Sequence, residues 1–169
     1  MKLTATSKTL CIDPGTTHSG VVIFDGLNIS LINKEWANKS LIDWMKNNRY
    51  ESKYLAIEGI ASYGMAVGAT TFETVEWIGR FREAYGFDRS TRIFRKDVKM
   101  FLCNSMRAKD TNVRQRILDI FPANGGGKTP QIGTKSNQGS LYGVTSHSLS
   151  ALAVGLTFKY SVMNREDVS

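Results

Sequence analysis

Two acidic residues end short apolar segments of the chain. Asp13 closes residues 9–13 and Glu58 closes residues 54–58, and both segments have the composition of buried strands. Ligands gather at the carboxyl ends of strands in open α/β sheets, so the two side chains converge if these strands are parallel neighbours. Paired carboxylates repel each other unless a cation lies between them, and their hard oxygens suit Mg²⁺ or Mn²⁺. Such ions can cleave a phosphodiester. Alternatively, each acid simply ends a strand in contact with water.

The rest of the sequence predicts the elements that must position these acids. Asp25-Gly26 is a strong hairpin signal, so the first three strands form an antiparallel meander. We expect Asn38 or Ser40 to cap the first helix, and residues 70–73 to form a capping box at the second. The expected strands are residues 9–13, 20–24, 29–32, 54–58 and 91–94, and the expected helices are residues 38–48, 71–86, 98–102, 110–121 and 146–162.

These elements predict one α/β domain over residues 1–169, with a mixed five-stranded sheet and helices on both faces. Residues 59–69 are rich in Gly and Ala, which indicates a flexible loop. Residues 122–143 are rich in Gly, Ser, Thr and Asn, which indicates a mobile loop. The Gly-Gly-Gly-Lys-Thr stretch at residues 125–129 lacks the first glycine of a phosphate-binding loop and follows a helix instead of a strand.

The positive charge of the chain is concentrated in one segment. The formal net charge is +7, and residues 80–116 hold eleven basic and four acidic residues, so the remaining chain is neutral. A basic segment on a neutral body is typical of a surface that binds a polyanion, nucleic acid above all. The alternatives are a solvated basic surface and a surface that docks an acidic protein.

The composition excludes several classes of protein. No run reaches the roughly 18 apolar residues of a membrane-spanning helix, and the first residues contain no secretory signal. Two cysteines, Cys11 and Cys103, are too few for a disulfide framework, which favours a reducing cytoplasm. The cysteines and the histidines, His18 and His147, lack the paired spacing of a zinc site.

Residues 13–20, Asp-Pro-Gly-Thr-Thr-His-Ser-Gly, place a glycine turn beside a carboxylate. This pattern occurs in actin-like and sugar-kinase ATPases and in RuvC-type Holliday junction resolvases. The ATPases need two such domains, and this chain holds one. Over residues 9–158 the chain resembles the RuvC family of the ribonuclease-H-like superfamily, particularly its short phage-encoded members. The segments that carry the resemblance are, in order, residues 12–15, 55–58, 95–99 and 146–154.

The resemblance implies a ribonuclease-H-like fold and a metal-dependent endonuclease. Such an enzyme cuts Holliday junctions or other branched DNA by paired nicks, with one or two Mg²⁺ or Mn²⁺ ions. The family's four metal-binding positions correspond to Asp13, Glu58, His147 and Ser150, and Lys99 falls on a lysine near the scissile phosphate. The family expects Asp or His at the position of His147. It expects Asp at the position of Ser150, where this chain departs from the pattern.

Ser150 leaves three hypotheses open. His147 and water complete the metal site, or Asp110 replaces the missing carboxylate, or the chain has lost catalysis and binds branched DNA without cutting it. The metal ligands that we expect are Asp13, Glu58, His147 and Asp110. A further hypothesis is a single-domain relic of an actin-like ATPase, which ATP binding would support.

DNA contacts are expected mainly from the basic segment, where they would hold the phosphate backbone without reading sequence. The candidates are Arg95, Lys96, Lys99, Arg107, Lys109, Arg114 and the aromatic Tyr63. Family members stack an aromatic residue on unpaired bases. The aligned residue here is Ala61, so stacking moves to Tyr63 or Phe72.

Two symmetric cuts across a junction need two active sites, so the resemblance implies a homodimer. The candidate dimer surface is the helix at residues 71–84, whose apolar residues cover more than one face. Alternatively, all of them belong to the core. We expect no membrane partner and a cytoplasmic location, in a host cell if the protein is phage-encoded.

Overall fold

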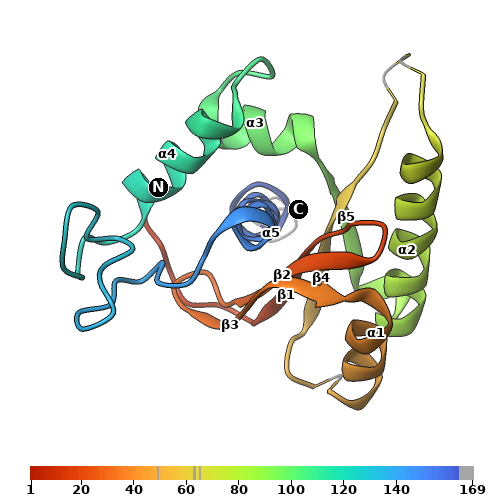
Figure 1. Cartoon of the computed structure of the whole chain (residues 1–169), viewed down its shortest axis with the longest axis horizontal. Coiled ribbons are helices and arrows are strands. Elements are labelled where there is room, and N and C mark those ends of the chain that lie inside the picture. The colour runs from red at the N-terminus through yellow and green to blue at the C-terminus, as the bar shows by residue number, and fades with distance from the viewer. Residues whose placement is uncertain (49, 63, 65, 164–169) are drawn as a thin grey trace.

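The centre of the fold is a five-stranded mixed sheet (Figure 1) in the order β3-β2-β1-β4-β5. The computed structural model describes residues 1–48, 50–62, 64 and 66–163. β1 pairs antiparallel with β2 and parallel with β4, β2 pairs antiparallel with β3, and β4 pairs parallel with β5. The predicted meander is therefore confirmed. The strands are β1 Thr9–Asp13, β2 His18–Phe24, β3 Ile29–Ala37, β4 Tyr54–Gly59 and β5 Ser90–Phe94.

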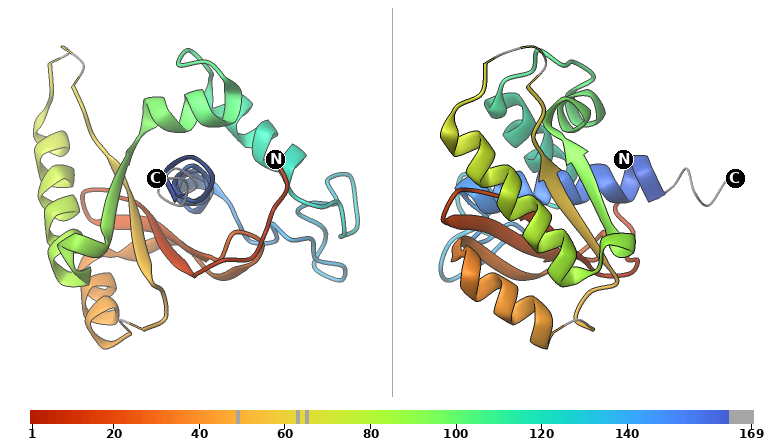
Figure 2. Two further views of the ribbon diagram at one scale, coloured as in Figure 1. Left: turned by 180° about the vertical axis from the view of Figure 1, so that it is seen from behind. Right: turned by 90° about the vertical axis from the view of Figure 1, so that its right-hand side faces the viewer.

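Helices cover both faces of the sheet, as predicted (Figure 2). On one face lie α1 and α2. On the other face α5 lies directly against the sheet, and α3 and α4 arch over it (Figure 1). The α-helices are α1 Asn38–Asn47, α2 Ala69–Tyr85, α3 Arg95–Cys103, α4 Asp110–Ile120 and α5 Ser146–Thr157. A 3₁₀ turn, Phe87–Arg89, precedes β5, and a π-helical turn, Phe158–Met163, follows α5. No helix in the described ranges is long and apolar enough to cross a membrane.

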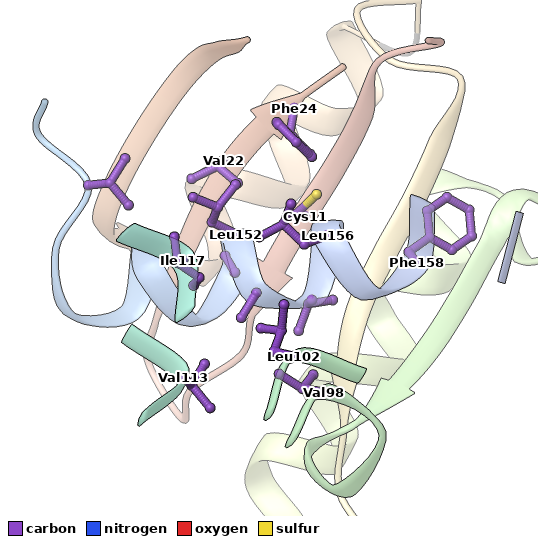
Figure 3. Close-up of a cluster of buried hydrophobic side chains, with 14 of the residues drawn as sticks. Cys11, Val22, Phe24, Val98, Leu102, Val113, Ile117, Leu152, Leu156 and Phe158 are labelled. Atoms are coloured by element: carbon purple, nitrogen blue, oxygen red, sulfur yellow. The ribbon is translucent and has the colours of Figure 1, made fainter. Parts of the chain in front are cut away.

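Strand periodicity divides the apolar residues between two cores. In β1, Leu10 and Ile12 point to the α1 and α2 face, and Cys11 points to the α5 face, because successive side chains of a strand point to opposite faces. The α5 core (Figure 3) contains Leu152 and Leu156 of α5 beside Cys11. Each sheet face is thus covered by its own helices, which holds the strand ends in fixed positions.

α5 lies close to the sheet because it carries small residues. Gly155 and its neighbours Ala151 and Ala153 are buried. A Cβ atom on Gly155 would lie 2.5 Å from Cys11 Sγ. Since real Cβ contacts are longer than this, the helix keeps its distance from β1 only with glycine at this position.

Several predicted boundaries are wrong. The side chains of Asn38 and Ser40 do not cap α1, because Ala37 is its N-cap and β3 runs directly into the helix. Residues 70–73 do not form a capping box, because α2 begins after Gly68 and Thr74 Oγ1 donates to the Thr70 carbonyl inside the helix. α3 begins at Arg95 rather than at residue 98, and α5 ends at Thr157, since the chain then widens into the π-helical turn.

Residues 122–143 form a loop without a helix or extended strand, as predicted. Backbone hydrogen bonds cross this loop, for example from Gly125 N–H to the Pro130 carbonyl and from Gly139 N–H to the Ile132 carbonyl. The loop therefore has a defined shape of its own, with an isolated bridge between Gly133 and Gln138.

α2 divides its apolar residues between core and surface. Ile78 and Phe81 are buried in the core, whereas Phe72 is 64% exposed and Val75 is 46% exposed. The alternative in which the whole helix is core is therefore wrong, because its first two turns project beyond the sheet. An apolar surface is therefore exposed on the first two turns of α2.

We expect alanine to have opposite effects at two helical glycines. Gly155→Ala should lower the free energy of unfolding by about 1–3 kcal/mol, because its Cβ overpacks against Cys11. Gly79→Ala in α2 should raise it by about 0.5–1 kcal/mol, because no atom lies within 4 Å of the new Cβ. Urea unfolding of both variants and of wild type measures the difference. Equal stabilisation by both substitutions would contradict the close packing of α5 on β1.

Candidate active site

The carboxyl ends of β1 and β4 bring Asp13 and Glu58 together. The two strands are parallel neighbours, with Ile12 opposite Ile57, which confirms the arrangement predicted for them. The two carboxyl groups lie close enough to change each other's pKa. Both are mostly buried, with 16% of the Asp13 side chain and 15% of the Glu58 side chain exposed.

Burial makes both carboxyl groups hold their protons more tightly, and the proximity of Asp13 adds to this effect for Glu58. Burial raises the pKa of Asp13, and the hydrogen bond from His147 opposes part of that shift. Burial and the neighbouring charge of Asp13 raise the pKa of Glu58 to about 7, against the opposing charge of Arg95. Two buried carboxylates this close favour either a shared proton or a bound cation.

His147 reaches the pair from the opposite end of the chain. Its Nδ1 lies 2.7 Å from Asp13 Oδ2. The side chain is 65% exposed, so the imidazole lies at the mouth of the site. It comes from the first turn of α5, where the Ser148 hydroxyl accepts from Thr145 N–H and donates to the Thr145 carbonyl. Ser146, the residue before His147, has a φ of 45°, which is a strained conformation for a residue other than glycine.

Gly20 allows α5 to reach the site. It lies on β2 opposite Asp13, and a Cβ atom there would overlap the His147 backbone. Any larger residue would push the start of α5 away from the hairpin. Gly20 thus determines the contact between His147 and Asp13.

Arg95 lies among the acidic residues of the site. Its Nη2 lies 2.6 Å from Asp110 Oδ1, and its Nη1 lies 3.9 Å from Glu58 Oε2. The hydrogen bond from Arg95 is the main reason why the pKa of Asp110 is low. The predicted role of Arg95 was DNA binding, but the structure places it inside the site because α3 begins directly after the parallel strand β5.

Ser150 faces a cavity of about 440 Å³ beside the carboxylates. His147 and Ser150 lie one turn apart on α5, and both line this cavity, as do Arg95 and Asp110. Asp110, the proposed replacement for a missing carboxylate, therefore lines the same cavity as Ser150. It is paired with Arg95 there.

The other predicted basic residues surround the cavity on α3 and α4. Lys99 is half-buried and close enough to Asp110 for its charge to lower the pKa of Asp110, after the larger effect of Arg95. The exposed residues are Lys96 on α3, Arg107 before α4, Lys109 at its start and Arg114 within it. Tyr63 lies outside the described residues.

Sequence analysis missed Asn38, which positions the turn after Asp13. The buried Asn38 amide donates to the Gly15 carbonyl at 2.9 Å and accepts from Ser19 Oγ at 2.7 Å. Its backbone N–H donates to the Thr17 carbonyl at 2.9 Å. The signal in the sequence is an asparagine where a helix is expected to begin, and this pattern predicts a helix cap.

The donor types at this edge are those that hard divalent cations take in proteins. Asp13 and Glu58 offer adjacent oxygens with raised pKa values, and His147 offers an imidazole on the exposed side. In the described ranges, no three His, Cys, Asp or Glu side chains already form a metal-binding group. The pairing of Asp110 with Arg95 explains why no third carboxylate joins the first two.

The fold is similar to two solved structures. One is Thermus thermophilus RuvC in complex with a Holliday junction substrate, with a TM-score of 0.56 and 20% sequence identity over 89% of this chain and 92% of that chain. The chain has the RuvC fold. A second structure of T. thermophilus RuvC gives a TM-score of 0.54 and 21% identity, with the same coverage. The ribonuclease-H-like fold expected from the sequence is therefore confirmed. No protein-family model and no curated protein matches the chain.

In this RuvC-like fold, we expect Glu58 to make stability depend on pH. The folded protein binds the Glu58 proton with a pKa of about 7, against 4.5 for the ordinary carboxyl. The folded state therefore holds more protons between these values, and stability falls as the pH rises through that window, by on the order of 3 kcal/mol. Glu58→Gln should be more stable than wild type at pH 8, and the difference should vanish near pH 4.

Chemical unfolding in EDTA at a series of pH values measures this effect. Glu76→Gln, on the exposed side of α2, is the matched control and should follow wild type at every pH. Parallel pH profiles for wild type and Glu58→Gln would contradict the proton-sharing arrangement.

Proposed function

We propose that this protein is a metal-dependent endonuclease that cuts branched DNA, Holliday junctions in particular, by paired nicks. The observation that carries the proposal is the buried pair of Asp13 and Glu58, with His147 at its exposed side. The pair lies at the carboxyl edge of a RuvC-like sheet. A solved structure with this fold holds a Holliday junction substrate.

Asp13 and Glu58 would hold Mg²⁺ or Mn²⁺, with His147 as the third donor. A bound ion of this kind polarises the phosphate and lowers the pKa of water. A cation held there would favour the ionised form of Glu58, whose pKa of about 7 reflects burial and the nearby Asp13 charge. His147 Nδ1 fixes the orientation of Asp13 Oδ2.

The basic residues around the cavity would hold the DNA backbone. Arg107, Lys109 and Arg114 are exposed on the α4 side, and Lys99 lies close to Asp110. Phe72 is the best described candidate for stacking on an unpaired base, because it is 64% exposed in the first turn of α2. Tyr63 remains a second candidate for this role.

Paired nicks require two active sites, so we propose that two copies act together. A two-fold dimer places one site on each strand of a symmetric junction. The exposed Val75 gives α2 apolar surface on which such a dimer could form.

A second candidate function is binding of branched DNA without cleavage. Ser150 favours it, because a neutral hydroxyl faces the cavity where a carboxylate is expected. The other available carboxylate, Asp110, is bound to Arg95. If this alternative holds, the loss of Asp13 would change affinity alone.

A labelled four-way junction with Mg²⁺ or Mn²⁺ tests the proposal. We expect wild type to make paired symmetric nicks and Asp13→Asn to lose at least about a hundredfold in rate, since a metal-binding carboxylate is removed. Asp43→Asn on α1, on the opposite face of the sheet, is the control and should cut like wild type. Tight binding without nicks, with cleavage gained in Ser150→Asp, would instead establish the non-catalytic alternative.

Junction affinity should depend steeply on salt if the basic residues contact phosphates. Replacing Arg107 or Lys109 with Ala should reduce the slope of log K against log salt by about 0.9 each, because each contact releases one counterion equivalent. Lys46→Ala, exposed on α1, should leave the slope unchanged. Fluorescence anisotropy over a salt series measures the slope. A flat salt response of wild type would contradict a phosphate-binding role for this segment.

A further inference from the structure

Arg95 has an unusual environment for a residue expected to bind DNA. Its Nη1 is fully buried and has no hydrogen-bond acceptor in the described part of the chain. A buried donor without an acceptor costs roughly 1–3 kcal/mol. The guanidinium nevertheless stays between Glu58 and Asp110, so attraction to these carboxylates outweighs that cost.

The charges at the site set how much further positive charge it can hold. Asp13, Glu58 and Asp110 carry three negative charges when ionised, and Arg95 reduces this to two. One divalent cation neutralises that remainder. A second divalent ion would leave an excess of two positive charges in a largely buried site, which is unfavourable at low dielectric.

Ser150 also limits the positive charge that the site can hold. It lines the cavity with Arg95 and Asp110, and its hydroxyl adds no negative charge. A carboxylate at position 150 would offer a ligand to a second ion. With a serine there, the nearest available carboxylate is Asp110, and the guanidinium already occupies its Oδ1.

We propose that this chain binds one divalent cation, at Asp13 and Glu58, and that the Arg95 guanidinium supplies the second positive charge of the site. The inference rests on the proposed function only in requiring a cation at this carboxyl edge. Arginine suits the role because its planar fork contacts Asp110 with one nitrogen and faces Glu58 with the other.

The test counts Mn²⁺ ions bound to the full chain without DNA, by electron paramagnetic resonance and calorimetry. Wild type should bind one ion. Arg95→Gln should also bind one, about tenfold more tightly, because a positive charge beside the ion is removed. Arg95→Lys keeps the charge and should stay within about threefold of wild type. Ser150→Asp with Arg95 retained should bind one ion, and the double variant Arg95→Gln, Ser150→Asp should bind two.

Arg92→Gln is the matched control. It removes the same charge from the exposed part of β5, three residues before Arg95, and should leave the number and affinity of bound ions unchanged. Two ions on wild type would overturn the inference. So would equal Mn²⁺ affinities for wild type and Arg95→Gln, or an Arg95→Lys variant that behaves like Arg95→Gln. Circular dichroism confirms that each variant is folded before the ions are counted.

Failure of this inference and failure of the proposed function are distinguishable. One Mn²⁺ bound with the expected response to Arg95→Gln, but no junction cleavage, would support the inference and contradict the nuclease. Junction cleavage with two Mn²⁺ ions on wild type would support the nuclease and overturn the inference.

Discussion

The site depends on the repulsion between two carboxyl groups that the sheet buries side by side. Asp13 and Glu58 cannot move apart, because β1 and β4 are hydrogen-bonded neighbours with helices on both faces. The repulsion must be relieved by a shared proton, by Arg95 or by a bound cation. Other contacts of the site respond to that negative charge. Arg95 faces Glu58, and His147 bonds Asp13.

Close packing of α5 delivers His147 to this pair. Gly20 leaves room for the backbone of His147, and Gly155 leaves room for Cys11 about two turns further along the helix. Asn38 holds the intervening turn by bonding Gly15 and Ser19. These three residues perform no chemistry, but they determine where the imidazole lies. The geometry of the site is therefore fixed by close packing at its edges as well as by charge at its centre.

Strand positions and the convergence of Asp13 and Glu58 were predictable, because strand periodicity and the strand-end rule are local patterns. The role of Arg95 was not recognised, although the same rule applied to β5 would have placed it beside the acids. Helix starts were mispredicted at Asn38, whose side chain bonds Gly15 instead of capping the helix, and at Thr70, which lies inside α2. Contacts across 134 residues, such as that of His147 with Asp13, came only from the family resemblance, because single-sequence patterns do not specify such pairings.

The separation of the site residues along the chain affects how the protein is made. Asp13 leaves the ribosome long before His147, and α5 is the central layer between the sheet and the arch of α3 and α4 (Figure 1). Until α5 emerges, the nascent chain exposes the apolar face that α5 will cover and lacks the imidazole beside Asp13. Translation of the last helix therefore completes the core and the site in the same step. A chain that ends before α5 would therefore expose apolar surface and favour aggregation.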